Sequence, residues 1–190
     1  MHDPSVLREL AVHAARETGA LLRHHAERGL RGLDTKSTAT DMVSDADREA
    51  EELLVRILSE ARPDDAILGE EGAGRDGTSG LRWVVDPLDG TTNFLHGIPH
   101  FAISIAVMET DQQGRRSITA GSVFDPVKNE FFFAEKGKGA FLNERRLRVS
   151  GRRGMADSLF ATGIPFLGRG DSDAHAAFLK ELAAVMAVSR

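Results

Sequence analysis

The spacing of apolar residues changes once along this chain, from a helical period to strand-like runs, and this change limits the folds it can adopt. Over residues 4–28, apolar side chains such as Leu10 and Leu22 recur at helical spacing with charges between them. Glycines end this stretch. Ser44 is a typical helix N-cap, and an apolar stripe at residues 53–58 predicts a second helix after it.

Short apolar runs bounded by glycine, proline and polar residues follow the two helices. The run at residues 81–85 has the character of a buried strand and is expected to end at Asp86. Two helices, a series of strands and a further helix favour a layered α/β architecture over a helical bundle or a β-barrel. The expected strands cover residues 66–68, 81–85, 101–107, 117–124, 130–134, 140–142 and 159–162, and the expected last helix covers residues 174–188.

The composition argues against several classes of partner and site. With 190 residues, 41% hydrophobic and 28% charged, the chain can form one globular domain across residues 1–190. The net charge of −5 and the lack of a basic block argue against a nucleic-acid partner. The absence of cysteine excludes disulfides and thiolate metal sites. No signal-peptide pattern or membrane-length apolar run is seen, so we expect a cytoplasmic protein without a membrane partner.

The most informative segment is residues 83–94, Trp-Val-Val-Asp-Pro-Leu-Asp-Gly-Thr-Thr-Asn-Phe. An apolar strand delivers two carboxylates, Asp86 and Asp89, at its exposed end. The proline between them fixes the backbone, so both acids can converge on one point instead of alternating across a sheet. Gly90 permits close backbone approach, and the threonines after it can open a short helix whose N–H groups face an anion.

Carboxylates beside a phosphate-binding turn repel the substrate unless cations lie between them. Hard oxygen ligands at a strand end therefore indicate Mg²⁺. The alternative is a simple turn, because Asp, Pro and Gly are common turn residues. A turn alone does not explain the two threonines and the asparagine that follow in the same string.

This string resembles the signature of the inositol monophosphatase family, and the resemblance extends over the whole chain. Lys36, the segment at residues 41–47 and Gly-Glu-Glu at residues 69–71 match the other N-terminal motifs of the family in order. The resemblance implies an α/β/α/β/α sandwich, as in inositol monophosphatase and fructose-1,6-bisphosphatase, and a homodimer. It also implies Mg²⁺-dependent hydrolysis of a small phosphate monoester, foremost inositol 1-phosphate.

The resemblance further implies a set of metal ligands. These are the side chains of Glu70, Asp86 and Asp89 and the backbone carbonyl of Leu88, with Asp86 bridging two ions. Two Mg²⁺ ions can activate a water molecule and stabilise both oxygens of an in-line displacement, so no covalent nucleophile is needed. Taken alone, the glutamate can equally be a solvated loop residue.

Catalytic and substrate-binding roles follow from the same resemblance. Gly90 and Thr91 would hold the phosphate together with Glu70, and Thr91 with Asp47 would help to activate the attacking water. Lys36 would have an electrostatic role. From the residues alone, Asp47 is also explained by a capping box after the N-cap serine, and the two roles are compatible.

Two other phosphate- or metal-binding patterns fit less well. In the haloacid dehalogenase class the nucleophilic Asp stands two positions before the second Asp, where this chain has Pro87. His96 and His100 are four residues apart, as zinc ligands on a helix can be, but Gly97 and Pro99 lie between them and disfavour a regular helix.

Several alternatives stay open within the family. The substrate can instead be fructose-1,6-bisphosphate, histidinol phosphate or adenosine 3′,5′-bisphosphate. Family members also carry a later Trp-Asp motif whose Asp completes the second metal site, and these 190 residues contain no counterpart. We therefore expect the chain to encode the family's reaction but to be weak or inactive alone, as a C-terminally incomplete fragment or an interaction module.

Overall fold

The computed structural model describes residues 4–28, 34–35, 42–43, 45–70, 72, 74–163, 170–184 and 188–189. The chain divides into two compact units. The first comprises Met1–Asp34 and Met42–Leu147, and the second comprises Thr35–Asp41 and Arg148–Arg190. One domain across residues 1–190 stays a prediction.

The elements follow the order that the sequence indicates, except that two short strands lie between the first two helices. Their bounds are α1 Pro4–Arg28, β1 Asp34–Thr35, β2 Met42–Val43, α2 Asp45–Ala61, β3 Ala66–Gly69, β4 Gly74–Arg75, β5 Leu81–Asp89, α3 Thr91–Leu95, β6 Ala102–Thr110, β7 Arg116–Asp125, β8 Glu130–Glu135, β9 Gly139–Leu142, β10 Arg145–Arg146, η1 Met155–Asp157, β11 Leu159–Phe160, α4 Ser172–Ala183 and β12 Val188–Ser189.

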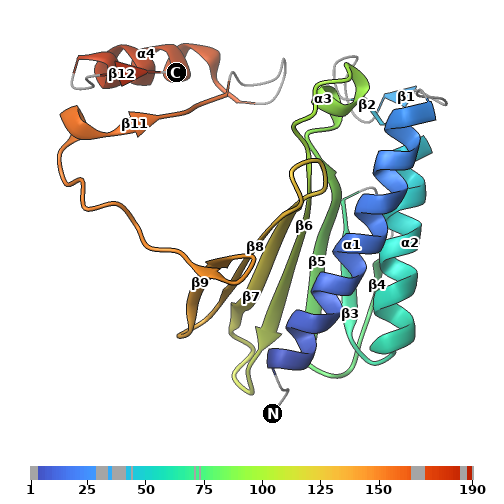
Figure 1. The fold of residues 1–190 in the computed structure, drawn as a ribbon. Helices are drawn as coiled ribbons and strands as arrows, with labels where there is room; N and C mark the ends of the chain where they lie inside the picture. Colours follow the sequence, from blue (N-terminus) through green and yellow to red (C-terminus); the bar gives the residue numbers. More distant parts are fainter. Residues whose placement is uncertain are drawn as a thin grey trace. The chain divides into compact units, whose positions relative to one another are not determined.

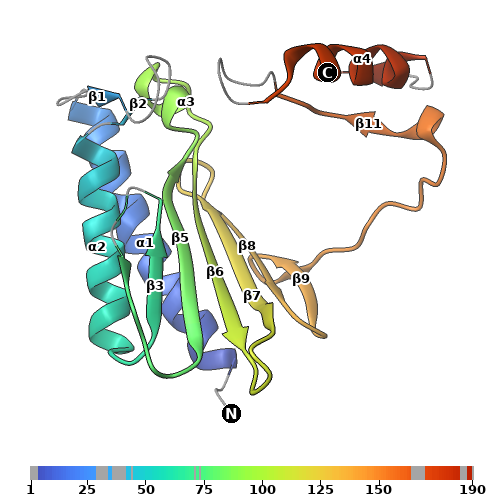
Figure 2. The same ribbon diagram turned by 180° about the vertical axis from the view of Figure 1, so that it is seen from behind.

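An eight-stranded mixed sheet forms the centre of the first unit, in the order β10-β9-β8-β7-β6-β5-β3-β4. Strands β3 and β5 run parallel, and the other neighbouring pairs are antiparallel. The helices α1 and α2 lie side by side along one face of this sheet (Figures 1 and 2). Helix α3 follows β5 at one end of the sheet, opposite the end where α1 begins (Figure 1). A site at α3 therefore lies beside the start of α2.

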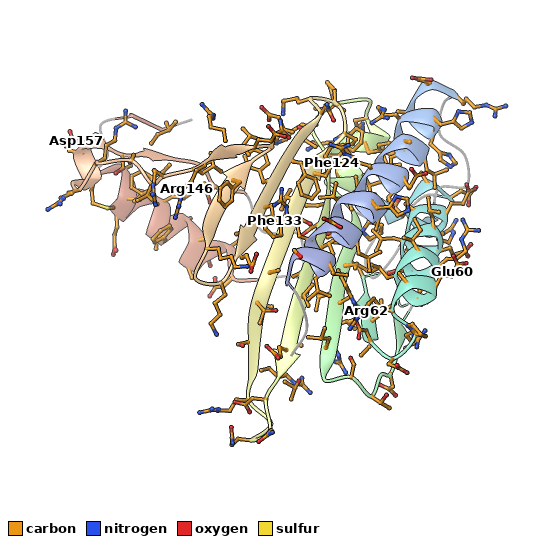
Figure 3. The ribbon with its side chains drawn as sticks, turned by 60° about the horizontal axis from the view of Figure 1, so that its bottom comes forward. Glu60, Arg62, Phe124, Phe133, Arg146 and Asp157 are labelled. Atoms are coloured by element: carbon orange, nitrogen blue, oxygen red, sulfur yellow. The ribbon has the colours of Figure 1, made fainter. Side chains whose placement is uncertain are left out.

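The core lies between the two helices and the sheet. Alternate positions of the strands point toward the helices, and Trp83, Ile103 and Phe124 are almost fully buried there. Leu22 of α1 and Leu54 of α2 meet them from the helical side. Figure 3 shows the side chain of Phe124 on the face of the sheet that α1 covers. The amphipathic periods of both helices and the alternation of the strands thus produce a single apolar layer.

At the end of the sheet far from α3, one buried carboxylate, Asp65, accepts hydrogen bonds from several segments of the chain. Its two oxygens accept hydrogen bonds from the Arg62 guanidinium at 2.8 and 3.1 Å, from the Ser79 hydroxyl at 2.6 Å and from the Trp83 indole at 2.9 Å. Burial by itself raises the pKa of Asp65, but these hydrogen bonds outweigh it and hold the pKa below its ordinary value. Because Arg62 follows α2 directly, the cluster connects that helix to β5 (Figure 3).

Several expected boundaries are wrong: β6 continues to Thr110, past the expected end at residue 107, and β11 ends at Phe160, before residue 162. Strand β5 does not end at Asp86 but continues to Asp89, which pairs with Ala102 after a register shift. Pro87 has no N–H to donate to a neighbouring strand. The pairing of β5 with β3 has already ended at Val85, so β5 can bulge at Pro87 without losing a hydrogen bond to β3.

The last helix is also shorter than expected. Helix α4 ends at Ala183, and Val188–Ser189 instead forms a parallel pair with Leu159–Phe160 within the second unit. The start of α4 is capped by Asp171, whose side chain accepts the backbone N–H groups of Asp173 and Ala174 at 2.9 Å. Among the helices that the structure describes, none combines the length and apolar character needed to cross a bilayer.

Candidate active site

Parallel pairing of β3 and β5 brings two acids together. Gly69 lies opposite Val85 in the register, so Glu70, the first residue after β3, lies next to Asp86 of β5. Burial raises the pKa of Asp86 to about 7, and a hydrogen bond with Glu70 and the negative charges of Glu70 and Asp89 add to the effect. Without a cation, burial and the repulsion among these carboxylates oppose the ionisation of all of them at once.

The bulge after Asp86 determines how the second aspartate is placed. The backbone N–H of Leu88 donates to Asp86 Oδ1 at 3.0 Å, which closes a tight local turn. The register shift then leaves Asp89 at the same strand end as Asp86, although the two residues are three positions apart. Pro87 and Leu88 are both buried, so the alternation of the strand is interrupted between the two acids.

A threonine joins this strand end to helix α2. The Thr91 hydroxyl lies 3.1 Å from Asp47 Oδ1 and 3.0 Å from the carbonyl oxygen of Leu88. Asp47 is in the first turn of α2 and is only 1% exposed. The predicted pair of Thr91 and Asp47 is therefore in direct contact, between residues that are 44 positions apart in the sequence.

Gly90 sets the start of α3. Its φ of 94° lies in the left-handed region, and a Cβ there would come within 3.1 Å of the carbonyl oxygen of His100. The short helix is held against the sheet by Phe94, whose ring packs edge-to-face on Phe101 with centroids 4.9 Å apart. Glycine is required here both for its backbone conformation and for the space beside it.

Asn93 is a positioning residue to which the sequence assigned no role. Its Nδ2 group donates to the carbonyl oxygen of His100 at 2.8 Å and so fastens α3 to the segment before β6. Its place in the string at residues 83–94 could have indicated this role, because an amide side chain one turn into a short helix can donate a hydrogen bond to a neighbouring loop carbonyl.

The donors at this strand end suit a hard divalent cation. They are carboxylate oxygens of Glu70, Asp86 and Asp89 and the carbonyl of Leu88, which are the ligand types that Mg²⁺ prefers. Across the described part of the chain, no three acidic or histidine side chains converge into a ready-made metal-binding group. The direct contact is between Glu70 and Asp86, and Asp89 acts on Asp86 through its charge.

Three residues that the sequence singled out fall outside the described ranges: Lys36, the N-cap Ser44, and Glu71. The pair His96 and His100 lies on exposed backbone around the end of α3, and it belongs to no metal-binding group among the described residues. The disfavoured zinc interpretation thus gains no support.

Fold and site together define a class: an α/β protein whose mixed sheet presents a group of carboxylates at the end of a parallel strand pair, next to a helix start. The profile of the inositol monophosphatase family matches residues 3–187. This chain belongs to the inositol monophosphatase family.

Two curated relatives are similar over most of this chain. An inositol-1-monophosphatase of Rhizobium meliloti (strain 1021) is 53% identical over 147 residues, which are 77% of this chain and 52% of that protein. The Nus factor SuhB of Pseudomonas aeruginosa is 46% identical over 164 residues, which are 83% of this chain and 57% of that protein. This chain therefore spans about half the length of the curated relatives that it matches.

A solved structure supports the fold directly. The crystal structure of the extragenic suppressor protein SuhB from Bartonella henselae superimposes with a TM-score of 0.86 at 42% identity, covering 97% of this chain and 69% of that one. The predicted layered α/β fold of the family is confirmed by this match.

Proposed function

We propose that this chain carries the catalytic centre of a Mg²⁺-dependent phosphate monoester hydrolase. The observation that carries the proposal is the contact of Glu70, directly after β3, with Asp86 of β5, where burial and then Glu70 raise the pKa of Asp86 to about 7. Such crowding of carboxylates is unfavourable in itself. It becomes favourable when a divalent cation neutralises the charge.

The ligands in this proposal are Glu70, Asp86, Asp89 and the carbonyl oxygen of Leu88. A bound Mg²⁺ would supply positive charge for the phosphate oxygens and lower the pKa of a water molecule. The carbonyl of Leu88 is held in place by the bulge and by the Thr91 hydroxyl 3.0 Å away. The second lone pair of that carbonyl oxygen stays available to a cation.

Thr91 and Asp47 orient the attacking water. The hydroxyl has one proton and two acceptors, the Asp47 carboxylate and the Leu88 carbonyl. A Thr91 hydroxyl that donates to Asp47 can accept a hydrogen bond from the water through its oxygen. As the water loses a proton to the Thr91 oxygen, the hydroxyl passes its own proton to the Asp47 carboxylate. No covalent nucleophile is required.

Gly90 and Thr91 would hold the phosphate through their backbone. The first N–H groups of a helix have no intrahelical acceptor, and the positive φ of Gly90 lets a ligand approach the start of α3 without meeting a side chain. Glu70 borders the same space from the end of β3. Binding and hydrolysis would therefore use one group of residues.

The substrate that we propose is inositol 1-phosphate, with other small sugar or nucleoside phosphates as alternatives. The support is the name of the Rhizobium meliloti relative, an inositol-1-monophosphatase that shares 53% of aligned residues. We also propose that the protein forms a homodimer, which light scattering coupled to size exclusion would detect.

The test measures inorganic phosphate released from myo-inositol 1-phosphate with Mg²⁺ and with EDTA. We expect release with Mg²⁺ and none with EDTA, and we expect Asp89→Asn to abolish it. Asp76→Asn is the matched control, because Asp76 is an exposed acid in the loop before β5. That variant should keep the full rate.

The same assay on a chain extended to the length of the relatives distinguishes a phosphatase site that lacks some of its residues from a chain that has no phosphatase site. Mg²⁺-dependent release by the extended chain, lost with Asp89→Asn, supports the proposal even where the 190-residue chain is slow. A folded extended chain that releases no phosphate from any of the proposed substrates would contradict it.

A further inference from the structure

A cleft of about 610 Å³ lies on the first unit, away from the carboxylate site. It is bounded by α1 on one side and on the other by the turn between β9 and β10 and the turn before β8. Helix α1 begins at the end of the sheet opposite α3 (Figure 1), and the cleft uses the first half of α1. Its volume lies in the range that small organic ligands occupy in proteins.

Three arginines from two elements line this cleft. Arg8 and Arg16 are eight residues apart on α1, so they lie on the same side of the helix about 12 Å apart along its axis. Arg145 comes from the opposite wall, at the start of β10. Among the described residues, none of the three guanidinium groups forms an ion pair. Glu144 is the acid in the lining of the cleft, and Glu9 and Glu17 lie along α1 beside an adjoining hollow.

The first of these arginines is held in place by an aromatic ring. The Arg8 guanidinium carbon lies 5.3 Å from the centroid of the Phe133 ring, a cation–π contact that orients the group without neutralising it. Figure 3 shows Phe133 on the face of the sheet next to α1. The charge therefore stays available to an anion in the cleft.

An amide completes the polar lining. Asn143 has a φ of 52°, its backbone N–H donates to the carbonyl of Phe131 at 2.8 Å, and the Phe131 N–H donates to Asn143 Oδ1 at 3.0 Å. Because Oδ1 must be the acceptor of a backbone N–H, the orientation of the amide is fixed and its Nδ2 group is left as a donor. The cleft thus presents donors from both walls.

The floor of the cleft is apolar. Phe131 is buried beneath it, and Val12 of α1 and Leu142 of β9 lie at its sides. A bare inorganic ion would leave this surface wet, whereas an organic body would cover it. Guanidinium groups and amide donors match the oxygens of a phosphoryl group in geometry and charge.

We propose that this cleft is a second ligand site, which binds an organic phosphate with its phosphoryl group at Arg8, Arg16 and Arg145 and its uncharged body on Phe131. The site is separate from the carboxylates at the other end of the sheet and requires no metal ion. It does not depend on the proposed hydrolase activity.

The test titrates phenylphosphonate, a non-hydrolysable organic phosphate analogue, into the EDTA-treated protein and follows backbone amide shifts by NMR. In EDTA the acids around Asp86 repel the probe. We expect shifts centred on the first half of α1 and on residues 142–146. Arg16→Gln and Arg145→Gln should each weaken binding about tenfold. Arg116→Gln, at an exposed position on β7, removes the same charge elsewhere and should leave the affinity unchanged.

Two control ligands test the chemistry. Inorganic phosphate should bind more weakly than phenylphosphonate, and phenol should not bind. The proposal is overturned if phenylphosphonate causes no shifts, if the shifts centre on residues 86–91, or if Arg116→Gln weakens binding as much as Arg145→Gln does. Equal affinity for inorganic phosphate would overturn the role of the apolar floor.

Discussion

At the scale of single residues, the Thr91 hydroxyl is the atom on which the proposed chemistry depends. It contacts Asp47 and the Leu88 carbonyl at 3.1 and 3.0 Å, so it joins the helix that holds the buried acid to the strand that holds the proposed metal ligands. A methyl group in its place would leave the Asp47 carboxylate without this donor. Buried carboxylates that lose a hydrogen-bond donor are destabilised as ions.

Replacement of the hydroxyl should therefore affect turnover more than binding. We expect Thr91→Ala to lower kcat about 100-fold, the usual contribution of a positioned proton-transfer group, with a smaller change in KM. Thr91→Ser retains the oxygen and should keep most of the rate. Steady-state kinetics with myo-inositol 1-phosphate measure both, and equal rates for the serine and alanine variants would contradict the role of the hydroxyl.

Gly90 offers a second test at this scale. Alanine there must adopt a φ of 94° and also place its Cβ 3.1 Å from the His100 carbonyl oxygen. Gly114 is a matched control, because it has a φ of 76° and a Cβ added there would meet no atom within 4 Å. Gly114→Ala should cost about 1 kcal/mol from the backbone alone.

We expect Gly90→Ala to lower the free energy of unfolding by about 1 kcal/mol more than Gly114→Ala does, because of the added contact. Urea unfolding of both variants measures the difference. Equal losses would mean that the start of α3 can move away from His100 at no cost.

At the scale of elements, strand β5 is anchored by side chains at both ends. Near its start, the Trp83 indole donates to Asp65 at 2.9 Å, and just after its end the Thr91 hydroxyl contacts Asp47 of α2 at 3.1 Å. The strand that presents the metal ligands is thus held at a point far from them. The Asp65 cluster contributes to the site through the position of the whole strand.

Loss of the Asp65 charge should destabilise the protein in a pH-dependent way. The pKa of Asp65 is lowered in the folded state, so its ionised form stabilises the fold above its unfolded pKa of about 3.9, and this stabilisation is lost as pH falls through the folded pKa. We expect Asp65→Asn to reduce the free energy of unfolding by about 3 kcal/mol at neutral pH.

The gap between wild type and Asp65→Asn should narrow below pH of about 4, because the wild-type carboxyl then becomes protonated as well. Urea unfolding across this pH range tests the sign. Asp76→Asn, at an exposed position, is the control and should follow the wild-type profile. A gap that is constant with pH would exclude a charge-based role for Asp65.

Elements with a long, regular apolar period could be predicted from the sequence. Helix α1 has the predicted bounds of residues 4–28, and the strands around Phe131 and Ile103 lie where the short apolar runs predicted them. The two-residue strands β4 and β10 were missed because so few residues show no period. The extension of β5 past Asp86 depends on a bulge, which is decided by the partner strand.

The candidate site was predicted mainly through the order of its motifs. The contact of Thr91 with Asp47 and that of Glu70 with Asp86 were both implied by the family resemblance, and the structure places each pair together. The Asp65 cluster was missed because its members are spread over residues 62–83 and form no short motif. Only the fold shows that they share one buried carboxylate.

At the scale of the whole molecule, a bound cation should stabilise the folded state by mass action. At a Mg²⁺ concentration of about 100 times its Kd, the free energy of unfolding should rise by about 2.7 kcal/mol. Differential scanning calorimetry with Mg²⁺ and with EDTA measures the shift in Tm. We expect it to disappear in Asp86→Asn and to persist in Asp76→Asn, and an equal shift in both variants would place the cation elsewhere.

The pairing of Thr91 with Asp47 also has a consequence for how the protein folds. Strands β6 to β10 form a meander of neighbours joined by short turns, so their contacts close small loops and form early. The hydrogen bond between α2 and α3 spans 44 residues and requires α2 to dock on a sheet that already exists. The active centre is thus among the last parts to assemble, and during refolding the recovery of activity should trail the appearance of β-sheet.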